Sequence, residues 1–304
     1  MSWKNLKTFA IAILVAMNAF FLYSLIERTH AVQYYDDKLI DSATEIFRES
    51  NLYVDRSFLT ARQVSLPVYT GTVSDVFFDD LSKKMESAGY IAEYGPGGMH
   101  FIGANDEYYI GNDFAFLYFT EEDSPKPSEL LLDGAFIKRE NPDFSEVEKI
   151  IQTFLSALSI PEQEKKFAYE LDFTDFYTSG TESVVCVMQK INGKDTENRL
   201  YLLLSEGHVI AADGFFALTS PQRRLSTQTV GMMEILFSEK NYLDERYRES
   251  GEISRENMIL SSVKISYAVY FDADGSFYFV PVRTLVYQNG ESRTYNDVSG
   301  EIYS

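Results

Sequence analysis

Apolar and polar residues follow three patterns along this chain of 304 residues, and the first is a long uncharged run near its start. The nineteen residues between Lys7 and Glu27 carry no charge. As a helix they would span about 28 Å, close to the roughly 30 Å thickness of the hydrocarbon core of a bilayer. We therefore predict that residues 1–29 form a cytoplasmic tip and a transmembrane anchor.

The charges beside this run predict its orientation. Lys4 and Lys7 precede it, and basic residues near a span stay on the cytoplasmic side of the membrane. The predicted localisation is the cell membrane, with a single span, a cytoplasmic N-terminus and an extracytoplasmic remainder. A signal peptide cleaved near Thr29-His30-Ala31 is the alternative, although the run exceeds the about 7–15 apolar residues of a typical signal peptide.

The second pattern is a helical period of apolar residues, which predicts two helices in the first half of the chain. One helix covers residues 32–50, with these residues on one side: Leu39, Ala43, Ile46 and Phe47. The other begins at Thr72, where Asp75 three residues later resembles a capping box, and continues to about Ala88. Its apolar stripe consists of Val73, Phe77, Leu81 and Met85.

Two more helices are predicted in the second half. Ser145 and Glu148 form another capping-box pattern, and Pro161 stops the helix that follows. The apolar residues of this helix keep the helical period: Val147, Ile150, Ile151, Phe154, Leu155 and Leu158. The last helix is centred on Val230, Met233, Leu236 and Phe237. The charged stretch 241–257 has little periodicity and is left open between helix and loop.

The third pattern is the alternation typical of β-strands. Short strands are predicted between Tyr90 and Thr120, with turns at Gly95–Gly98 and Gly103–Asp106. Four strands are predicted between about 167 and 216, and a three-stranded antiparallel meander at the end of the chain. In the first strand of that meander, apolar residues alternate with smaller or more polar ones: Val263, Ile265, Tyr267, Val269 and Phe271. Dipeptides that favour hairpin turns separate the later strands: Asn192-Gly193, Glu206-Gly207, Asp274-Gly275 and Asn289-Gly290.

Together these patterns predict an α+β fold. A single N-terminal transmembrane helix is followed by two or more units, each of which packs one helix against an antiparallel meander. The charged stretch from Glu121 to Pro127 contains two prolines and is either a long hairpin loop or a domain boundary, and we favour a boundary between this stretch and Pro142. We expect a first extracytoplasmic α+β unit at 30–127 and a second extracytoplasmic α+β region at 142–304, with a further division near residue 220 as an alternative.

Charge and cysteine content limit the partners and the source of stability. The chain has 46 acidic and 27 basic residues, a net charge of −19. Such acidity disfavours nucleic acid and anionic membrane surfaces as partners, so we predict no nucleic-acid binding and a membrane link through one helix only. The single Cys186 excludes an internal disulfide and lies in an apolar strand, where a free cysteine behaves as a small hydrophobic residue.

Residues that carry catalysis or bind metals are sparse. His30, His100 and His208 lie far apart in the sequence, and none has a second ligand at metal-binding spacing. The chain contains no P-loop, no Gly-x-Ser-x-Gly motif and no zinc-protease motif. We predict that the protein is not an enzyme and has no catalytic, cofactor-binding or metal-binding residues. An exported cell-wall hydrolase with paired carboxylates is the enzymatic alternative.

The order of residues at the two ends of the chain carries a family resemblance. Near the start, Trp3 and two lysines lead into an apolar run in which Asn18 is followed by Phe20-Phe21-Leu22. Near the end, three segments follow one another: Ile265-Ser266-Tyr267, Pro281-Val282 and the stretch from Asn296 to Gly300. These features resemble YycI, which together with its relative YycH forms a family of membrane-anchored regulatory proteins of Firmicutes.

The resemblance implies a function in signal transduction. Members of this family are not enzymes; they associate through their transmembrane helices with the WalK (YycG) sensor histidine kinase of a two-component system and tune its control of cell-wall metabolism. The implied partners are therefore a WalK-like kinase and a YycH-like paralogue. The implied function is that of an extracytoplasmic accessory regulator, which acts through its transmembrane helix and its outer domains.

Asn18 and a stripe of small residues are the predicted contacts with a partner helix. In lipid, a hydrogen bond between helices that involves an amide contributes roughly 0.6 to 2 kcal/mol. Ala12, Ala16 and Ala19 form a stripe about 120° around the helix from Asn18, and small residues let helix backbones approach closely. Two contact faces would suit a kinase with two spans.

A binding module is the alternative function. In this hypothesis the chain is a PepSY-like exported module or protease inhibitor, in which similar units of a helix on a meander occur, and the anchor only tethers it. The regulator needs the sequence of the anchor itself, whereas the module would function with any neutral anchor.

Overall fold

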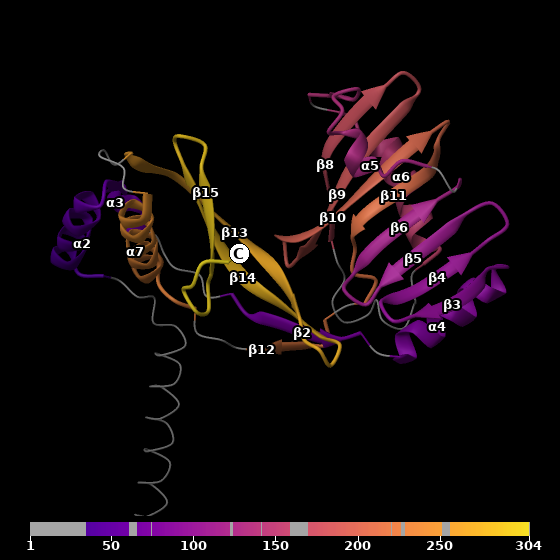
Figure 1. Ribbon diagram of the computed structural model, residues 1–304, viewed down its shortest axis with the longest axis horizontal. Helices are drawn as coiled ribbons and strands as arrows, with labels where there is room; N and C mark the ends of the chain where they lie inside the picture. Colours follow the sequence, from indigo (N-terminus) through magenta and orange to yellow (C-terminus); the bar gives the residue numbers. More distant parts are fainter. Residues whose placement is uncertain are drawn as a thin grey trace, which may run out of the picture. The chain divides into compact units, whose positions relative to one another are not determined.

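The computed structural model describes residues 35–60, 66–73, 75–121, 124–140, 142–158, 170–219, 221–225, 229–250 and 256–303. These residues form a mixed α/β structure with a large, mainly antiparallel sheet and six helices (Figure 1). Contacts between residues divide the chain into two compact units. Unit 1 takes its described residues from the ranges 1–65 and 231–259, and unit 2 takes them from 66–230 and 260–304.

The predicted anchor lies outside the described residues. This applies to the whole of the predicted segment 1–29, including Asn18 and the alanines at positions 12, 16 and 19. Within the described ranges, no helix combines the length and the apolar character that a membrane crossing requires. The transmembrane helix therefore stays a prediction from the sequence.

The described residues of unit 1 form three helices and a short parallel strand pair. The helices are α2 (Asp37–Glu49), α3 (Arg56–Thr60) and α7 (Met232–Ser250). The strand β1 (Leu52–Tyr53) pairs with the first two residues of β13 (Met258–Phe271). Helix α7 includes most of the charged stretch that the sequence left open.

Helix α2 packs against α7 through a narrower stripe than the sequence predicts. Asp36 caps its start by accepting a hydrogen bond from the backbone N–H of Lys38. Ile40, Ala43 and Phe47 are buried, and the rings of Phe47 and Phe237 meet edge to face with centroids 5.0 Å apart. The predicted stripe is therefore wrong in part: Ala43 and Phe47 face the core, whereas Leu39 and Ile46 are 49% and 37% exposed.

Unit 2 contains one long antiparallel sheet with the strand order β7-β8-β9-β10-β11-β6-β5-β4-β3. The first meander consists of β3 (Ile91–Gly95), β4 (Gly98–Ile102), β5 (Glu107–Gly111) and β6 (Ala115–Phe119). The second consists of β8 (Glu170–Ser179), β9 (Glu182–Ile191), β10 (Lys194–Ser205) and β11 (His208–Phe215). The edge strand β7 (Ile137–Lys138) completes the sheet.

The sheet joins two copies of the same motif. Helix α4 (Asp75–Ser87) precedes the first meander and α6 (Ser145–Ser156) precedes the second. The last strands of the two meanders, β6 and β11, pair antiparallel with Asp213 opposite Leu117. Each copy is thus the helix and antiparallel meander that the sequence predicts. Because the copies share a sheet, both predicted ranges, 30–127 and 142–304, contribute strands to it.

The core of unit 2 lies between this sheet and the two helices. Helix α4 contributes Phe77, Phe78, Leu81 and Met85, and α6 contributes Ile151 and Leu155. On the opposite face, the short helix α5 (Pro127–Leu130) covers a smaller cluster around Val184, Leu203 and Ala211. Both faces are therefore covered near β9, β10 and β11, which explains the nearly continuous apolar run from Val184 to Met188.

Local turn and cap chemistry explains several element ends. Asn192 and Gly193 both have positive φ, 51° and 69°, as the predicted two-residue hairpin requires. The capping box predicted for α6 is wrong: the N-cap is Phe144, without a side-chain cap bond. Instead, Asp143 Oδ1 accepts a hydrogen bond of 2.9 Å from the backbone N–H of Ser145.

A second antiparallel sheet within unit 2 carries the predicted C-terminal meander. Its strands are β2 (Val68–Thr72), β12 (Arg223–Leu225), β13, β14 (Ser276–Tyr287) and β15 (Ser292–Asn296). One pair of residues, Thr196 on β10 and Tyr267 on β13, links it to the first sheet. Aromatic residues fill the junction between the sheets: Tyr69, Phe114, Tyr267, Phe277 and Phe279.

Candidate ligand groove

Three hairpin turns of unit 2 surround an open groove with a volume of about 590 Å³. The turns connect β3 to β4, β5 to β6, and β13 to β14, and the start of α4 lies beside them. The groove is lined by Val73, Phe78, Tyr94, Gly95, Pro96, Asn112, Asp113 and the stretch from Phe271 to Gly275. Its size falls within the range of ligand-binding pockets.

Backbone hydrogen bonds hold the first two turns together. The carbonyl oxygen of Gly97 accepts bonds from the backbone N–H of Asn112 at 2.9 Å and from the Tyr109 hydroxyl at 3.0 Å. Gly98 has φ of 152°, and a Cβ at this position would lie 2.2 Å from the Ile110 carbonyl oxygen. The sequence therefore needs glycine here so that the two turns can approach so closely.

Phe114 fixes the β5–β6 turn in an unusual backbone conformation. Its φ is 68°, a region that costs a bulky residue of the order of 1–3 kcal/mol. Its buried ring offsets this cost by packing edge to face against Phe271 and Phe277, with centroid distances of 4.9 and 5.0 Å. The strained residue thus locks the turn that carries Asn112 and Asp113 at the groove.

The β13–β14 turn supplies two more carboxylates. Asp272 N–H donates to the Ser276 carbonyl at 2.8 Å, and Gly275 N–H donates to the Asp272 carbonyl at 3.1 Å. Asp274 Oδ1 accepts a bond of 2.9 Å from Ser276 N–H, and this hydrogen bonding lowers the pKa of Asp274. Because Val73 N–H also donates to the Gly275 carbonyl at 3.0 Å, the turn is tied to the segment that leads into α4.

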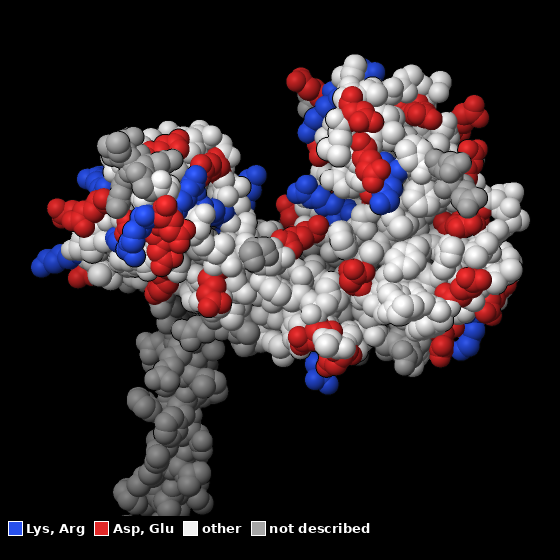
Figure 2. Space-filling view, in the orientation of Figure 1, with Lys and Arg blue, Asp and Glu red and all other residues white. Residues whose placement is uncertain are grey.

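Aromatic side chains and carboxylates dominate the groove lining. Tyr94 packs edge to face against Phe78, with centroids 6.0 Å apart, yet remains 60% exposed, and Phe271 is 37% exposed. Among the described residues that line the groove, Asp113, Asp272 and Asp274 carry carboxylates, and none is a lysine or an arginine. On the visible face of unit 2, acidic side chains outnumber basic ones (Figure 2). The groove therefore combines apolar contact area with a negative potential.

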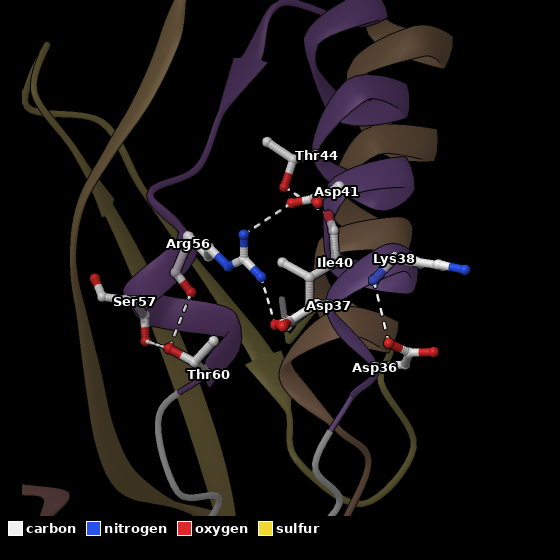
Figure 3. Close-up of polar contacts among 9 residues, drawn as sticks. All are labelled: Asp36, Asp37, Lys38, Ile40, Asp41, Thr44, Arg56, Ser57 and Thr60. Atoms are coloured by element: carbon white, nitrogen blue, oxygen red, sulfur yellow. Dashed lines mark hydrogen bonds and ion pairs between the residues drawn. The ribbon is translucent and has the colours of Figure 1, made fainter.

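A second, polar cavity of about 470 Å³ lies in unit 1 between α2 and the segment that contains α3. Arg56 reaches from α3 to two carboxylates on α2, bonding Asp37 and, at 3.0 Å, Asp41 (Figure 3). All three side chains are substantially exposed, so each pair contributes about 0–1 kcal/mol. We interpret this cluster as surface ion pairs that connect α3 to α2.

The buried carboxylate of Asp213 also has a structural role. It accepts a hydrogen bond of 2.8 Å from the backbone N–H of Ser128 and another from the Ser128 hydroxyl. Ser128 lies in the first turn of α5, where free N–H groups and the helix dipole favour a negative charge. Asp213 therefore caps α5. This contact holds the helix over the cluster around Val184, Leu203 and Ala211.

The residues that the sequence marked for chemistry are not brought together. His100 Nε2 lies 3.0 Å from Glu107 Oε2, His208 is exposed on β11, and His30 falls outside the described residues. Cys186 is buried, and burial raises the pKa of its thiol. In the part of the chain that the structure describes, no three His, Cys, Asp or Glu side chains are placed to hold a metal ion.

Sequence reasoning missed the groove, although it found two of its parts. The glycine-rich stretch Gly95–Gly98 and the dipeptide Asp274-Gly275 were both predicted as turns. Their convergence depends on how the two sheets of unit 2 pack, and this packing has no local signature. The positive φ of Phe114 likewise has no signal in its residue type, because phenylalanine rarely adopts it.

Comparison with known proteins yields distant likenesses in structure only. No protein-family model and no curated protein matches the chain. An uncharacterized protein from Eubacterium rectale ATCC 33656, solved at 1.45 Å resolution, is similar over 84% of this chain and 91% of its own, with a TM-score of 0.44 and 13% identity. The Bacillus megaterium YpeB C-terminal domain is similar over 77% of this chain and 96% of its own, with a TM-score of 0.32 and 10% identity. Scores this low assign neither a family nor a function.

Proposed function

We propose that this protein is a non-enzymatic accessory protein, tethered outside a membrane, that binds a polypeptide partner in the groove of unit 2. The observation that carries this proposal is the convergence of three hairpin turns around exposed aromatic residues. Large exposed aromatics beside a concave surface are typical of binding sites, because they bury much apolar area on contact.

The construction of the groove supports a binding role. Gly97 joins the β3–β4 turn to the β5–β6 turn, Gly275 ties the β13–β14 turn to Val73, and the strained Phe114 is held by an aromatic cluster. A surface that is already rigid loses little conformational freedom on binding. The proposal keeps the module hypothesis drawn from the sequence, in which the predicted anchor serves as a tether.

A peptide-display selection on the full-length protein in lipid nanodiscs tests this function. We expect enriched peptides that bind the wild type and lose binding to Tyr94→Ala. Ile91→Ala is the matched control, because Ile91 is an exposed apolar residue on the same strand whose side chain points to the opposite face. Enriched peptides that bind Tyr94→Ala as well as the wild type would contradict the proposal.

The kinase regulator is the second candidate, and the sequence of residues 8–26 favours it. An amide at Asn18 and the alanine stripe give this segment features that a simple tether does not need. In this hypothesis the partners are a WalK-like sensor histidine kinase and a YycH-like paralogue. Replacing residues 8–26 with an unrelated neutral helix separates the two functions: a regulator loses its effect on kinase output, whereas a binding module retains its peptide affinity.

A further inference from the structure

We propose that the groove selects an extended peptide segment that carries lysine or arginine. This inference rests on the proposed function and adds the chemistry of the ligand to it. Its basis is the combination of three carboxylates, contributed by two different turns, with the exposed rings of Tyr94 and Phe271.

The charges of the groove favour a cationic ligand over an anionic one. Asp113 lies on the β5–β6 turn, whereas Asp272 and Asp274 lie on the β13–β14 turn, so negative charge faces the groove from two sides. None of the lining residues that the structure describes is basic. With a net charge of −19 for the whole chain, the field around the groove attracts cations and repels acidic peptides.

The aromatic rings add a second reason for cation selection. The face of an aromatic ring carries partial negative charge and attracts the ammonium group of lysine or the guanidinium group of arginine. Tyr94 and Phe271 are partly exposed at the groove, so a long basic side chain can lay its apolar stem on a ring and direct its charge toward a carboxylate. Arginine should bind better than lysine because its planar group also stacks on rings.

A peptide suits this groove better than a metal ion does. Asp274 already accepts a hydrogen bond from Ser276, and Asp113 Oδ1 accepts one of 3.1 Å from Ala115 N–H. No three potential metal-binding side chains meet there among the described residues. The open groove, with turn backbone and aromatic rings along its walls, instead offers contacts to several residues of an extended chain.

Fluorescence polarisation with three short labelled peptides tests the inference. The peptides alternate leucine with arginine, glutamine or glutamate, and the protein is the full chain in nanodiscs of uncharged lipid, with empty nanodiscs as a blank. We expect the arginine peptide to bind most tightly, and its affinity to fall as salt rises. The double variant Asp272→Asn with Asp274→Asn should weaken its binding by about two- to thirtyfold, the range for two exposed ion pairs.

A matched variant controls for the change in net charge. Asp133→Asn with Glu140→Gln removes two exposed carboxylates elsewhere in unit 2 and should leave the affinity unchanged. Asparagine at position 274 retains an oxygen that can accept the Ser276 bond, so the turn should persist. Thermal melting of each variant verifies that the fold is intact.

The outcomes separate this inference from the function on which it rests. Equal binding of all three peptides, weakened by Tyr94→Ala but not by the carboxylate variant, would overturn the cation selectivity and leave the groove as a binding site. If no peptide binds and the display selection yields no Tyr94-dependent sequence, both proposals are wrong. If calcium alone stabilises the protein and this effect needs Asp272 and Asp274, the carboxylates bind an ion and the peptide inference is wrong.

Discussion

Arg283 and Asp297 form an ion pair that water scarcely reaches. Nη2 of Arg283 donates to Oδ2 of Asp297 over 3.0 Å and lies 2.8 Å from Oδ1, and the two side chains are 4% and 0% exposed. Asp297 also holds the chain through its backbone: its N–H donates to the Pro281 carbonyl, and its carbonyl accepts a 2.7 Å bond from Val230 N–H. The pair therefore fixes the end of β15 against β14 and the segment that precedes α7.

Breaking this pair should strongly destabilise unit 2. Burial raises the pKa of Asp297, and the charge of Arg283 acts against that shift. Asp297→Asn leaves the guanidinium buried beside a neutral group, which costs about 3–5 kcal/mol for pairs of this kind. Urea unfolding of the variant measures the loss as a lower midpoint at unchanged slope.

Two control variants identify burial as the cause. Replacing both Arg283 and Asp297 with leucine removes both charges and should restore most of the stability. Arg56→Gln breaks two exposed ion pairs at the surface of unit 1 and should cost no more than about 2 kcal/mol. If Asp297→Asn and Arg56→Gln lower the free energy of unfolding by the same amount, burial does not determine how much an ion pair contributes.

A tyrosine cluster predicts loss of stability at high pH. The Tyr90 hydroxyl donates to Asp106 over 2.8 Å, and desolvation together with this carboxylate raises the pKa of Tyr90 to about 12. The pKa values of Tyr108 and Tyr118 are also raised, mainly by burial. Above about pH 10, the unfolded chain loses these protons while the folded protein keeps them. The free energy of unfolding should therefore decrease as pH rises from about 10 to 12.

Denaturant unfolding at several alkaline pH values tests this cluster. Tyr90→Phe removes one of the shifted groups, so its stability should depend less steeply on pH than that of the wild type. If the free energy of unfolding falls as steeply with pH in Tyr90→Phe as in the wild type, Tyr90 has the same pKa in the folded and unfolded states, and the prediction is wrong.

The sequence predicted the local elements of this fold well, because their signals are local. The period of apolar residues located α4 and α6, and asparagine-glycine and similar dipeptides located four of the hairpins, those at Gly193, Gly207, Gly275 and Gly290. The pairing of β6 with β11 and the packing of α2 on α7 were not predicted. Both join residues far apart in the sequence, and no side chain in either element specifies its partner.

Buried polar networks were equally invisible in the sequence. The side-chain amide of Gln189 donates to the Ala217 carbonyl and accepts from the Ala217 N–H, each over 2.9 Å. It also accepts a 2.9 Å bond from Asn198. These residues look like ordinary polar strand positions until the fold encloses them. The groove was missed for the same reason, since only tertiary packing brings its three turns together.

Phe154 should be essential to the packing of α6. Its ring meets Tyr118 edge to face with centroids 4.8 Å apart, and it also contacts the rings of Tyr108 and Phe116. Phe154→Asp removes an apolar contribution of about 1.5–3 kcal/mol and forces a charge against the core, so it should unfold unit 2. Circular dichroism and thermal melting measure this loss.

A conservative variant separates the effect of a smaller apolar side chain from the effect of a buried charge. Phe154→Leu keeps an apolar side chain and should melt at a lower temperature while remaining folded. Glu146→Asp, on the exposed side of the first turn of α6, should leave the melting temperature nearly unchanged. A folded Phe154→Asp with a native melting temperature would show that α6 does not depend on this contact.

The last prediction concerns Asn18, which lies outside the described residues. If its amide bonds a partner helix in the membrane, Asn18→Leu should weaken association with a WalK-like kinase while leaving insertion intact, because lipid solvates leucine better than asparagine. The expected loss is about threefold to thirtyfold, the equivalent of roughly 0.6 to 2 kcal/mol. Ala16→Leu should also interfere, by keeping the helix backbones apart.

Co-purification from membranes, or a membrane two-hybrid signal, measures this association. Leu14→Ile serves as the matched control, because it keeps the volume and the apolar character of a residue in the same segment. Unchanged association and kinase output after replacement of residues 8–26 by an unrelated neutral helix would show that the anchor is only a tether. Recognition would then reside outside residues 8–26, and the groove of unit 2 is our candidate for it.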